Sequence, residues 1–324
     1  MRFRSTAACA VLTVSIVAPS VGFAASEGEW TYTDGSGQTV TLDEVPATTV
    51  MHASAAAALI PLGIRPTAIF ADQSIESDPQ LRGLDLSGID IVGEEWGVIN
   101  IEAIAALDPD LIVSEYWPLE DGYTGLEEGT GEANSALFDI APVVGVTQGT
   151  SVAARIDDYS VLAESLGADL DAPAIASERE RFEEAVERFK TVVASKPDLT
   201  VLAVSPTAES LYVAVPAGAA ELSDFVSWGL NIIEPEPDPS FPYWETLSWE
   251  NATKYQADLI IYDDRVGTTG LDQAEAQPTW SLLTAVEAGA VTNWPAFWLR
   301  NYTAYADQLD NLSDVIETTD EHLV

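Results

Sequence analysis

Apolar positions along this chain fall into short runs separated by turn residues and helical stretches. Two alternating runs, residues 30–33 and 38–42, flank a glycine-containing loop and predict a β-hairpin. After it, runs rich in β-branched residues alternate with helical segments, and Ser54 is the expected N-cap of the first helix. We expect strands at 48–52, 67–70, 89–92, 110–114, 143–146, 199–204, 211–215 and 258–262. Such alternation is typical of an α/β protein with a mainly parallel, buried sheet.

The alternation is interrupted in the middle of the chain. Apolar side chains recur there at helical spacing, with glutamate and arginine between them: Ile175, Phe182, Val186, Phe189 and Val193. This spacing indicates a long amphipathic helix, with Asp171 as its N-cap and Pro173 in its first turn. The βα pattern then restarts, so the sequence predicts two α/β lobes on either side of one long helix. The expected division is 1–24 (signal peptide), 25–170 (N-terminal lobe), 171–196 (linking helix) and 197–324 (C-terminal lobe).

The first 24 residues have the pattern of a secretory signal. Two arginines precede an apolar stretch from Ala7 to Val17, and small residues occupy the cleavage positions Gly22 and Ala24. The stretch is too short for a convincing membrane span. We therefore expect cleavage near Ala24 and an extracytoplasmic protein, in a periplasm or at a cell surface. The only cysteine, Cys9, lies inside this segment, so the mature protein would have no disulfide, cysteine nucleophile or thiolate metal site.

The charge of the chain is strongly negative. There are 53 Asp and Glu residues against 13 Lys and Arg, which gives a net charge of −40 at neutral pH. Nucleic acids and anionic membrane surfaces require a basic footprint, so neither is an expected partner. The excess of acid favours solubility. Apolar residues make up 47% of the chain, which predicts a packed core.

A series of short motifs follows in a set order between residues 30 and 318. They are the hairpin with Val45-Pro46, then 62–66 (Leu-Gly-Ile-Arg-Pro), Val92-Gly93, 100–102 (Asn-Ile-Glu), 107–112 (Leu-Asp-Pro-Asp-Leu-Ile), 140–144, 163–167, 247–250 and 257–260. Each motif is short, but their order and spacing resemble the ferric-siderophore and cobalamin group of periplasmic binding proteins. The resemblance implies two Rossmann-like lobes, joined by one rigid α-helix, with the ligand cleft between the lobes.

The resemblance also implies a function. The protein would act as the solute receptor of an ABC importer, capturing a ferric siderophore and delivering it as a monomer to the permease dimer, without catalysis. In this family one glutamate on each lobe docks onto arginines of the permease, and the matching residues are Glu102 and Glu250. Each begins a short helix, where a carboxylate is favoured by the partial positive charge of the helix end. The alternative is that both are simply solvated, as most glutamates are in so acidic a chain.

Ligands of α/β sheets bind at the carboxyl ends of the strands, and these ends line the cleft in this architecture. The candidate ligand-binding residues at or after such ends, or in the proline-rich loop, are His52, Tyr116, Trp117, Tyr243, Trp244, Arg265, Trp294, Trp298 and Arg300. Aromatic side chains suit a bulky, partly apolar chelate. The scarce arginines suggest an anionic or carbonyl-rich guest.

Each of these candidates also has a purely structural interpretation. The aromatic residues are equally suited to a core or a lid. Arg265 has Asp263 and Asp264 nearby in the sequence as salt-bridge partners, and His52 fits a strand-end histidine whose hydrogen bonds are satisfied.

Other functions remain open at this stage. The same fold binds cobalamin, haem or other small organic solutes, and a hydrolase that uses cleft acids is an alternative of a different class. The chain has only two distant histidines and lacks the His-Glu-x-x-His, calcium-loop and Gly-x-Ser-x-Gly patterns. We therefore expect no catalytic residue, no metal site of the protein itself and no cofactor.

Overall fold

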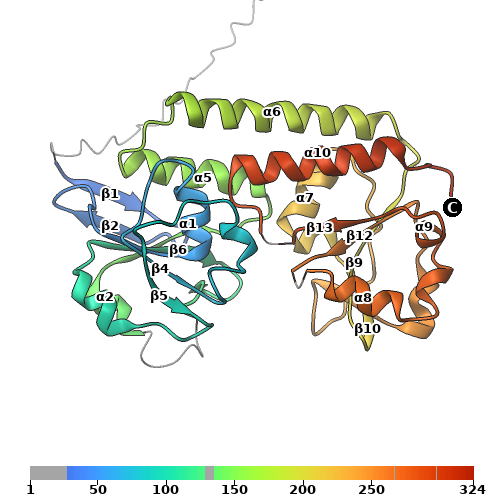
Figure 1. Ribbon diagram of the computed structural model, residues 1–324, viewed down its shortest axis with the longest axis horizontal. Helices are drawn as coiled ribbons and strands as arrows, with labels where there is room; N and C mark the ends of the chain where they lie inside the picture. The colour runs from blue at the N-terminus through green and yellow to red at the C-terminus, as the bar shows by residue number, and fades with distance from the viewer. Residues whose placement is uncertain (1–27, 128–134, 266, 297) are drawn as a thin grey trace, which may run out of the picture.

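The computed structural model describes residues 28–127, 135–265, 267–296 and 298–324. The expected signal peptide and Cys9 lie outside these ranges. Two β-sheets lie side by side, and helices α6 and α10 run along one side of them (Figure 1). We refer to the part of the chain around the first sheet as the N-terminal lobe and the part around the second as the C-terminal lobe.

The first sheet contains six strands in the order β5-β4-β3-β6-β7, with β8 also paired to β6. The strands are β3 (Thr49–His52), β4 (Ala68–Ala71), β5 (Asp90–Glu94), β6 (Leu111–Trp117), β7 (Gly122–Tyr123) and β8 (Val143–Thr147). All pairings are parallel except that of β7 with β6. The helices of this lobe are α1 (Ala53–Leu59), η1 (Pro79–Leu81), α2 (Ile101–Leu107), α4 (Leu137–Ile140) and α5 (Val152–Ser165). The predicted parallel sheet is therefore present.

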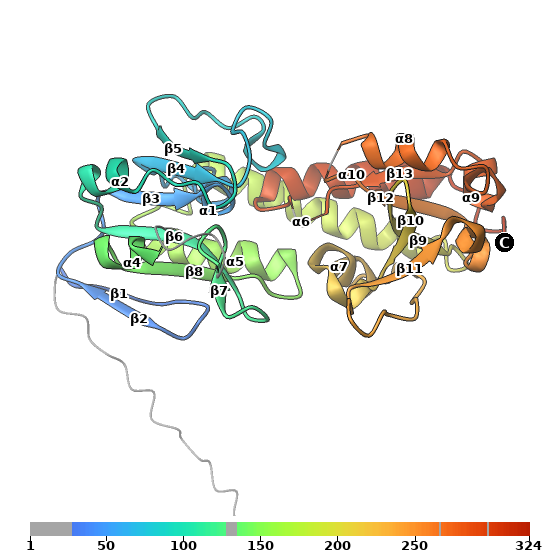
Figure 2. The same cartoon turned by 90° about the horizontal axis from the view of Figure 1, so that it is seen from below.

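The predicted hairpin consists of β1 (Trp30–Thr33) and β2 (Thr39–Leu42), which pair antiparallel. It lies beside β6 and β8 of the first sheet (Figure 2). The buried Asp34 carboxylate holds the hairpin in place, because it accepts hydrogen bonds from the Tyr123 hydroxyl (2.7 Å) and the Gly145 amide (3.1 Å).

The second sheet has five strands in the order β11-β10-β9-β12-β13. They are β9 (Val201–Pro206), β10 (Ser210–Ala214), β11 (Trp244–Ser248), β12 (Leu259–Asp263) and β13 (Val291–Trp294). This sheet is mixed: β9, β12 and β13 are parallel, whereas β10 is antiparallel to both of its neighbours. Only residues 207–209 connect β9 to β10, too few for the crossover that a parallel pair needs.

Helical segments surround the second sheet. They are η2 (Pro216–Gly218), α7 (Ala220–Ser227), η3 (Trp249–Lys254), α8 (Thr269–Glu275), η4 (Trp280–Leu282), α9 (Thr284–Glu287) and α10 (Tyr302–Thr318).

The long helix predicted in mid-chain is α6 (Pro173–Ala194). It extends over both lobes, with α5 and α10 beneath it (Figure 1). Pro173 occupies its first turn as expected, but Asp171 does not cap it; the N-cap is Ala172, which makes no side-chain hydrogen bond. The apolar face of α6 packs through Phe182 on Tyr302 and Tyr305 of α10. The helix is therefore fixed along its length rather than suspended between the lobes.

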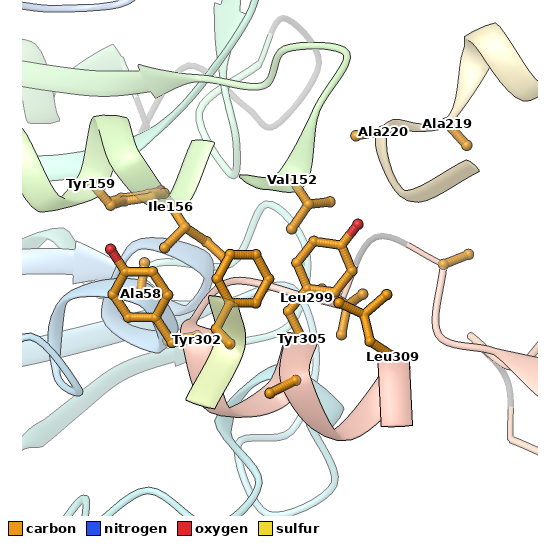
Figure 3. Close-up of a cluster of buried hydrophobic side chains, with 14 of the residues drawn as sticks. Ala58, Val152, Ile156, Tyr159, Ala219, Ala220, Leu299, Tyr302, Tyr305 and Leu309 are labelled. Carbon is orange, nitrogen blue, oxygen red and sulfur yellow. The ribbon is translucent and has the colours of Figure 1, made fainter. Parts of the chain in front are cut away.

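The apolar core is continuous across the lobes. A single cluster of buried side chains includes Met51 and Leu111 from the first sheet and Val201 and Leu259 from the second. Figure 3 shows its central part, where side chains of α5, α7 and α10 meet. A shared core opposes large movements of one lobe against the other, because opening would expose apolar surface to water.

A buried carboxylate ties the lobes together within this cluster. Asp224 of α7 accepts hydrogen bonds from the amides of Val152 (2.9 Å) and Ala153 (3.1 Å), at the start of α5 in the other lobe. The Tyr305 hydroxyl also donates to it, at 2.8 Å, and points toward Val152 (Figure 3). Burial and the charge of Asp224 both raise the pKa of Tyr305 well above its usual value. One side chain thus joins α5, α7 and α10.

Replacing Asp224 by alanine is expected to lower the free energy of unfolding by about 2–4 kcal/mol, because three donors lose their common acceptor. Asp224→Asn keeps one oxygen acceptor and is expected to lose less. Urea unfolding followed by tryptophan fluorescence measures both changes. Asp90→Ala, which removes an exposed carboxylate from β5, is the control. An unchanged unfolding midpoint in Asp224→Ala would contradict this role.

Candidate functional site

A cavity of about 350 Å³ opens between the two lobes. Parallel strands of both sheets end at its wall. The lining residues at or directly after these ends are His52 (β3), Asp72 (β4), Trp117 (β6), Gln148 (β8), Arg265 (β12) and Trp294 (β13). The cavity therefore lies where the strand-end rule for α/β sheets places a ligand.

The structure brings together eight of the nine candidate ligand-binding residues. Those that line the cavity are His52, Trp117, Tyr243, Trp244, Arg265, Trp294, Trp298 and Arg300. Their contact with a ligand remains a prediction.

Tyr116 is not among the lining residues. We expected its strand to end at Ser114, but β6 continues to Trp117. Successive side chains of a strand point to opposite faces, so Glu115 and Trp117 face the cavity and Tyr116 turns away. Its hydroxyl donates to Asp121 at 2.6 Å.

Several lining residues were not anticipated from the sequence. They include Ser54, Asp72, Gln80, Glu115, Thr124, Gln148 and Phe241. Asp72 and Gln148 directly follow strands, so the rule that identified the other residues also applies to them. Glu115 required knowledge of where β6 ends. Gln80 and Phe241 lie outside the strands and carry no comparable signal.

Aromatic side chains form the wall that the C-terminal lobe contributes. The rings of Trp244 and Trp294 lie 6.3 Å apart, and those of Phe241 and Tyr243 also 6.3 Å apart. The Arg265 guanidinium lies 5.7 Å from the centre of the Trp244 ring, within range of a cation–π contact. A broad aromatic wall with few polar groups suits a bulky, partly apolar guest.

The base of the cavity contains a buried ion pair. Nε of Arg300 lies 2.8 Å from Oε1 of Glu115, and Nη2 donates to Oε2 at 3.1 Å. Arg155, also buried, lies 3.9 Å from the same carboxylate and donates to the Leu299 carbonyl. Burial lowers the pKa of Arg300, and the negative charge of Glu115 opposes this shift. The pair joins β6 of one lobe to the segment that precedes α10 in the other.

Arg265 is paired as well. Its Nε donates to Oδ2 of Asp263 at 2.6 Å, and its backbone amide donates to Oδ1 at 2.9 Å. The salt bridge to Asp263 that the sequence suggested as an alternative is therefore present. The guanidinium lies at the cavity wall with its charge already balanced.

His52 is held at both ring nitrogens. Nδ1 accepts the Ser54 amide at 3.2 Å and lies 2.8 Å from the Ser54 hydroxyl, while Nε2 lies 3.3 Å from Oδ2 of Asp72. His52, rather than Ser54, thus caps α1, and the helix begins earlier than expected. Ser54 is only 1% exposed, so its hydroxyl is not presented as a nucleophile. The contacts orient the imidazole instead.

The two glutamates expected to dock are both exposed. Glu102 lies in the first turn of α2, on the side of the N-terminal lobe that faces away from α6 (Figure 1), and Glu250 lies in the first turn of η3. Hydrogen bonds from its own backbone amide and from Ser248 lower the pKa of Glu250. Both positions are open to a partner, and docking itself remains a prediction.

The chain belongs to the family of periplasmic binding proteins. Residues 58–296 match this family. Among solved structures, it is similar to DesE, a ferric-siderophore receptor protein from Streptomyces coelicolor, at 30% identity and a TM-score of 0.80, over 90% of this chain and 99% of that one. The siderophore periplasmic binding protein from the fuscachelin gene cluster of Thermobifida fusca is 25% identical, with a TM-score of 0.62, over 84% of this chain and 97% of that one.

More distant structures share the fold. One is SirA of Staphylococcus aureus, complexed with staphyloferrin B, at 18% identity and a TM-score of 0.60, over 90% of this chain and 99% of that one. No match was found among curated protein sequences.

The family accounts for the main features of the molecule. The protein is a solute-binding receptor rather than an enzyme, with two α/β lobes and a long linking helix. A transporter permease is its partner in general terms, and an extracytoplasmic location fits the family. Within the described ranges, no helix is both long and apolar enough to cross a membrane. In the same part of the chain, no group of three or more His, Cys, Asp or Glu side chains is arranged to hold a metal ion.

Glu115→Gln is expected to lower the free energy of unfolding by about 3 kcal/mol or more, because it leaves two buried arginines without their shared carboxylate. Arg300→Met is expected to cost less, since Arg155 remains near Glu115. Urea unfolding gives both values, and Arg181→Met on the exposed side of α6 is the control. Equal stability of Glu115→Gln and the unmodified protein would show that the buried pair does not stabilise the fold.

Proposed function

We propose that this protein captures a ferric siderophore outside the cytoplasm and delivers it to the permease of an ABC importer. The observation that carries the proposal is the cavity between the lobes, with its aromatic wall and few polar groups. Its volume falls within the range of small-molecule sites. Similarity to the ferric-siderophore receptor of Streptomyces coelicolor, over nearly the whole of both chains, supports the same class of guest.

The capture step depends on a cavity that is largely preformed. The shared core, the contacts of Asp224 and the packing of α6 on α10 all oppose wide opening of the lobes. A preformed cavity loses little conformational entropy on binding, so affinity depends on the fit of the chelate to the aromatic wall.

The delivery step would use Glu102 and Glu250, one on each lobe, as contacts for arginines of a permease dimer. Both carboxylates are exposed and lie in first turns, where they are accessible to a large partner. In this proposal the receptor acts as a monomer after its signal peptide is removed near Ala24.

Haem is a weaker candidate than a siderophore. An axial ligand would have to come from the cavity, and His52 is its only histidine. Its Nδ1 accepts the Ser54 amide and its Nε2 faces Asp72, so neither nitrogen is directed to an iron atom. Cobalamin and other organic solutes remain as competitors in the binding assay.

Tryptophan fluorescence of the mature protein, titrated with ferric hydroxamate, catecholate and citrate complexes, haem and cobalamin, tests the proposal. We expect saturable quenching by one class of ferric chelate, with Kd near 1 μM or lower (about −8 kcal/mol). Trp117→Leu is expected to weaken binding about tenfold, by removing an aromatic contact. Trp96→Leu, an exposed tryptophan that is not part of the cavity, is the control. Binding of haem or cobalamin alone would refute the siderophore assignment.

Docking is tested in cells that depend on this receptor. The double variant Glu102→Gln and Glu250→Gln should bind the chelate with unchanged affinity but reduce uptake at least tenfold, because contacts to the permease are lost. The matched control replaces Glu164 and Glu209, exposed glutamates at other places on the two lobes, by glutamine. Normal uptake by the first double variant would exclude these residues as the docking contacts.

A further inference from the structure

The arginines of the cavity do not present an excess of positive charge. Arg300 is paired with Glu115 at 2.8 Å, and Arg265 with Asp263 at 2.6 Å. Each pair is held by two contacts, an arrangement that fixes the guanidinium as well as balancing it. A guest entering the cavity therefore meets matched ion pairs and no bare cation.

The groups behind these pairs keep the same balance. Arg155, beneath Arg300, adds a positive charge, and the fully buried Glu221 adds a negative charge that acts on Arg300. Beside Arg265 lies Asp264, whose pKa is raised by burial and by the charge of Asp263, and lowered by Arg82.

Asp72 adds a negative charge that no arginine or lysine matches within hydrogen-bonding distance in the described part of the chain. It lines the cavity directly after β4, and its side chain is 37% exposed. Its neighbour is His52, at 3.3 Å. Glu127 also senses Asp72: burial is the main cause that raises the pKa of Glu127, and the charge of Asp72 raises it further. The wall contributed by the N-terminal lobe is therefore negative.

We infer that the cavity selects ferric chelates without net negative charge, neutral or cationic, and disfavours anionic ones. An anionic chelate would lose its hydration on entry and find no unmatched cation in exchange. A cationic chelate gains from Asp72. This inference rests on the proposed function and narrows its substrate class.

The charge rule points to one type of iron-binding group. Three hydroxamates cancel the charge of Fe³⁺, and a free amine makes the complex cationic. Three catecholates leave a strongly negative complex, and hydroxycarboxylate complexes are negative as well. Of the two guests that the arginines suggested at the outset, anionic or carbonyl-rich, the geometry favours an uncharged, carbonyl-rich one.

The test compares four ferric complexes by tryptophan quenching at pH 8: a linear trihydroxamate with a free amine, the same compound with its amine acetylated, a tricatecholate and citrate. We expect the two hydroxamates to bind at least about tenfold more tightly than either anion. Tighter binding of the tricatecholate or of citrate would overturn the charge inference and leave the receptor function intact. Failure of all four to bind would instead refute the proposed function.

Asp72→Asn isolates the surplus charge. It is expected to weaken binding of the amine-bearing complex about fivefold, while the acetylated complex changes less than about twofold. Asp108→Asn, an exposed aspartate in the left-handed conformation at the end of α2, is the matched control. An equal loss for both complexes would show that Asp72 acts through structure rather than charge, and would count against the inference.

Ionic strength gives a measurement on the unmodified protein. Raising NaCl from about 0.05 to about 0.5 M should weaken binding of the amine-bearing complex and leave the acetylated complex unchanged, because salt screens the attraction at a partly exposed carboxylate. The opposite result, stronger binding of the cationic complex at high salt, would contradict a negatively charged wall.

Discussion

The buried pair of Glu115 and Arg300 is the interaction on which the arrangement of the cavity depends. Removing two charges from water is costly, and the cost is offset only when the geometry of the pair is good. Glu115 lies on a strand of the N-terminal lobe, and Arg300 precedes the last helix, so their contact sets how the two sheets face each other at the base of the cleft. Arg155, from a third element, uses the same carboxylate. Neither lobe can turn far without separating these charges.

The apolar contacts around this pair act in the same direction. The linking helix α6 packs on α10 through Phe182, and the core continues from one sheet to the other. Asp224 adds a polar contact at the start of α5. A receptor built this way recognises its solute with a shape that exists before binding. The gain is a low entropic cost of capture, and the consequence is that the lining residues determine which guest fits.

The charge of the whole molecule and the charge of the cavity have the same sign. A net charge of −40 produces a negative field around the protein, which attracts cations and repels anions before any contact is made. Inside the cavity, matched arginines and the carboxylate of Asp72 continue this preference at short range. The acidic composition, which speaks first for solubility, therefore also acts on the approach of a charged chelate. Salt weakens the long-range part more than the short-range part.

Much of the fold and part of the site could be predicted from the order of residues alone. Alternating and helical periodicities predicted the strands and the linking helix, because these patterns arise from contacts between near neighbours. The rule that ligands lie at strand ends located eight of the nine candidates at the cavity. The excess of acid excluded nucleic acid as a partner without any structure.

Other features depended on contacts between distant residues. The direction of Tyr116 depended on the true end of β6, and the cap of α1 on His52 turning back to Ser54. The pairing of Glu115 with Arg300 joins positions 185 residues apart. No local pattern encodes such a pair, because its partners are chosen by the packing of two lobes. The sequence therefore determined the elements and the class of protein, whereas the tertiary structure decided which charges meet in the cavity.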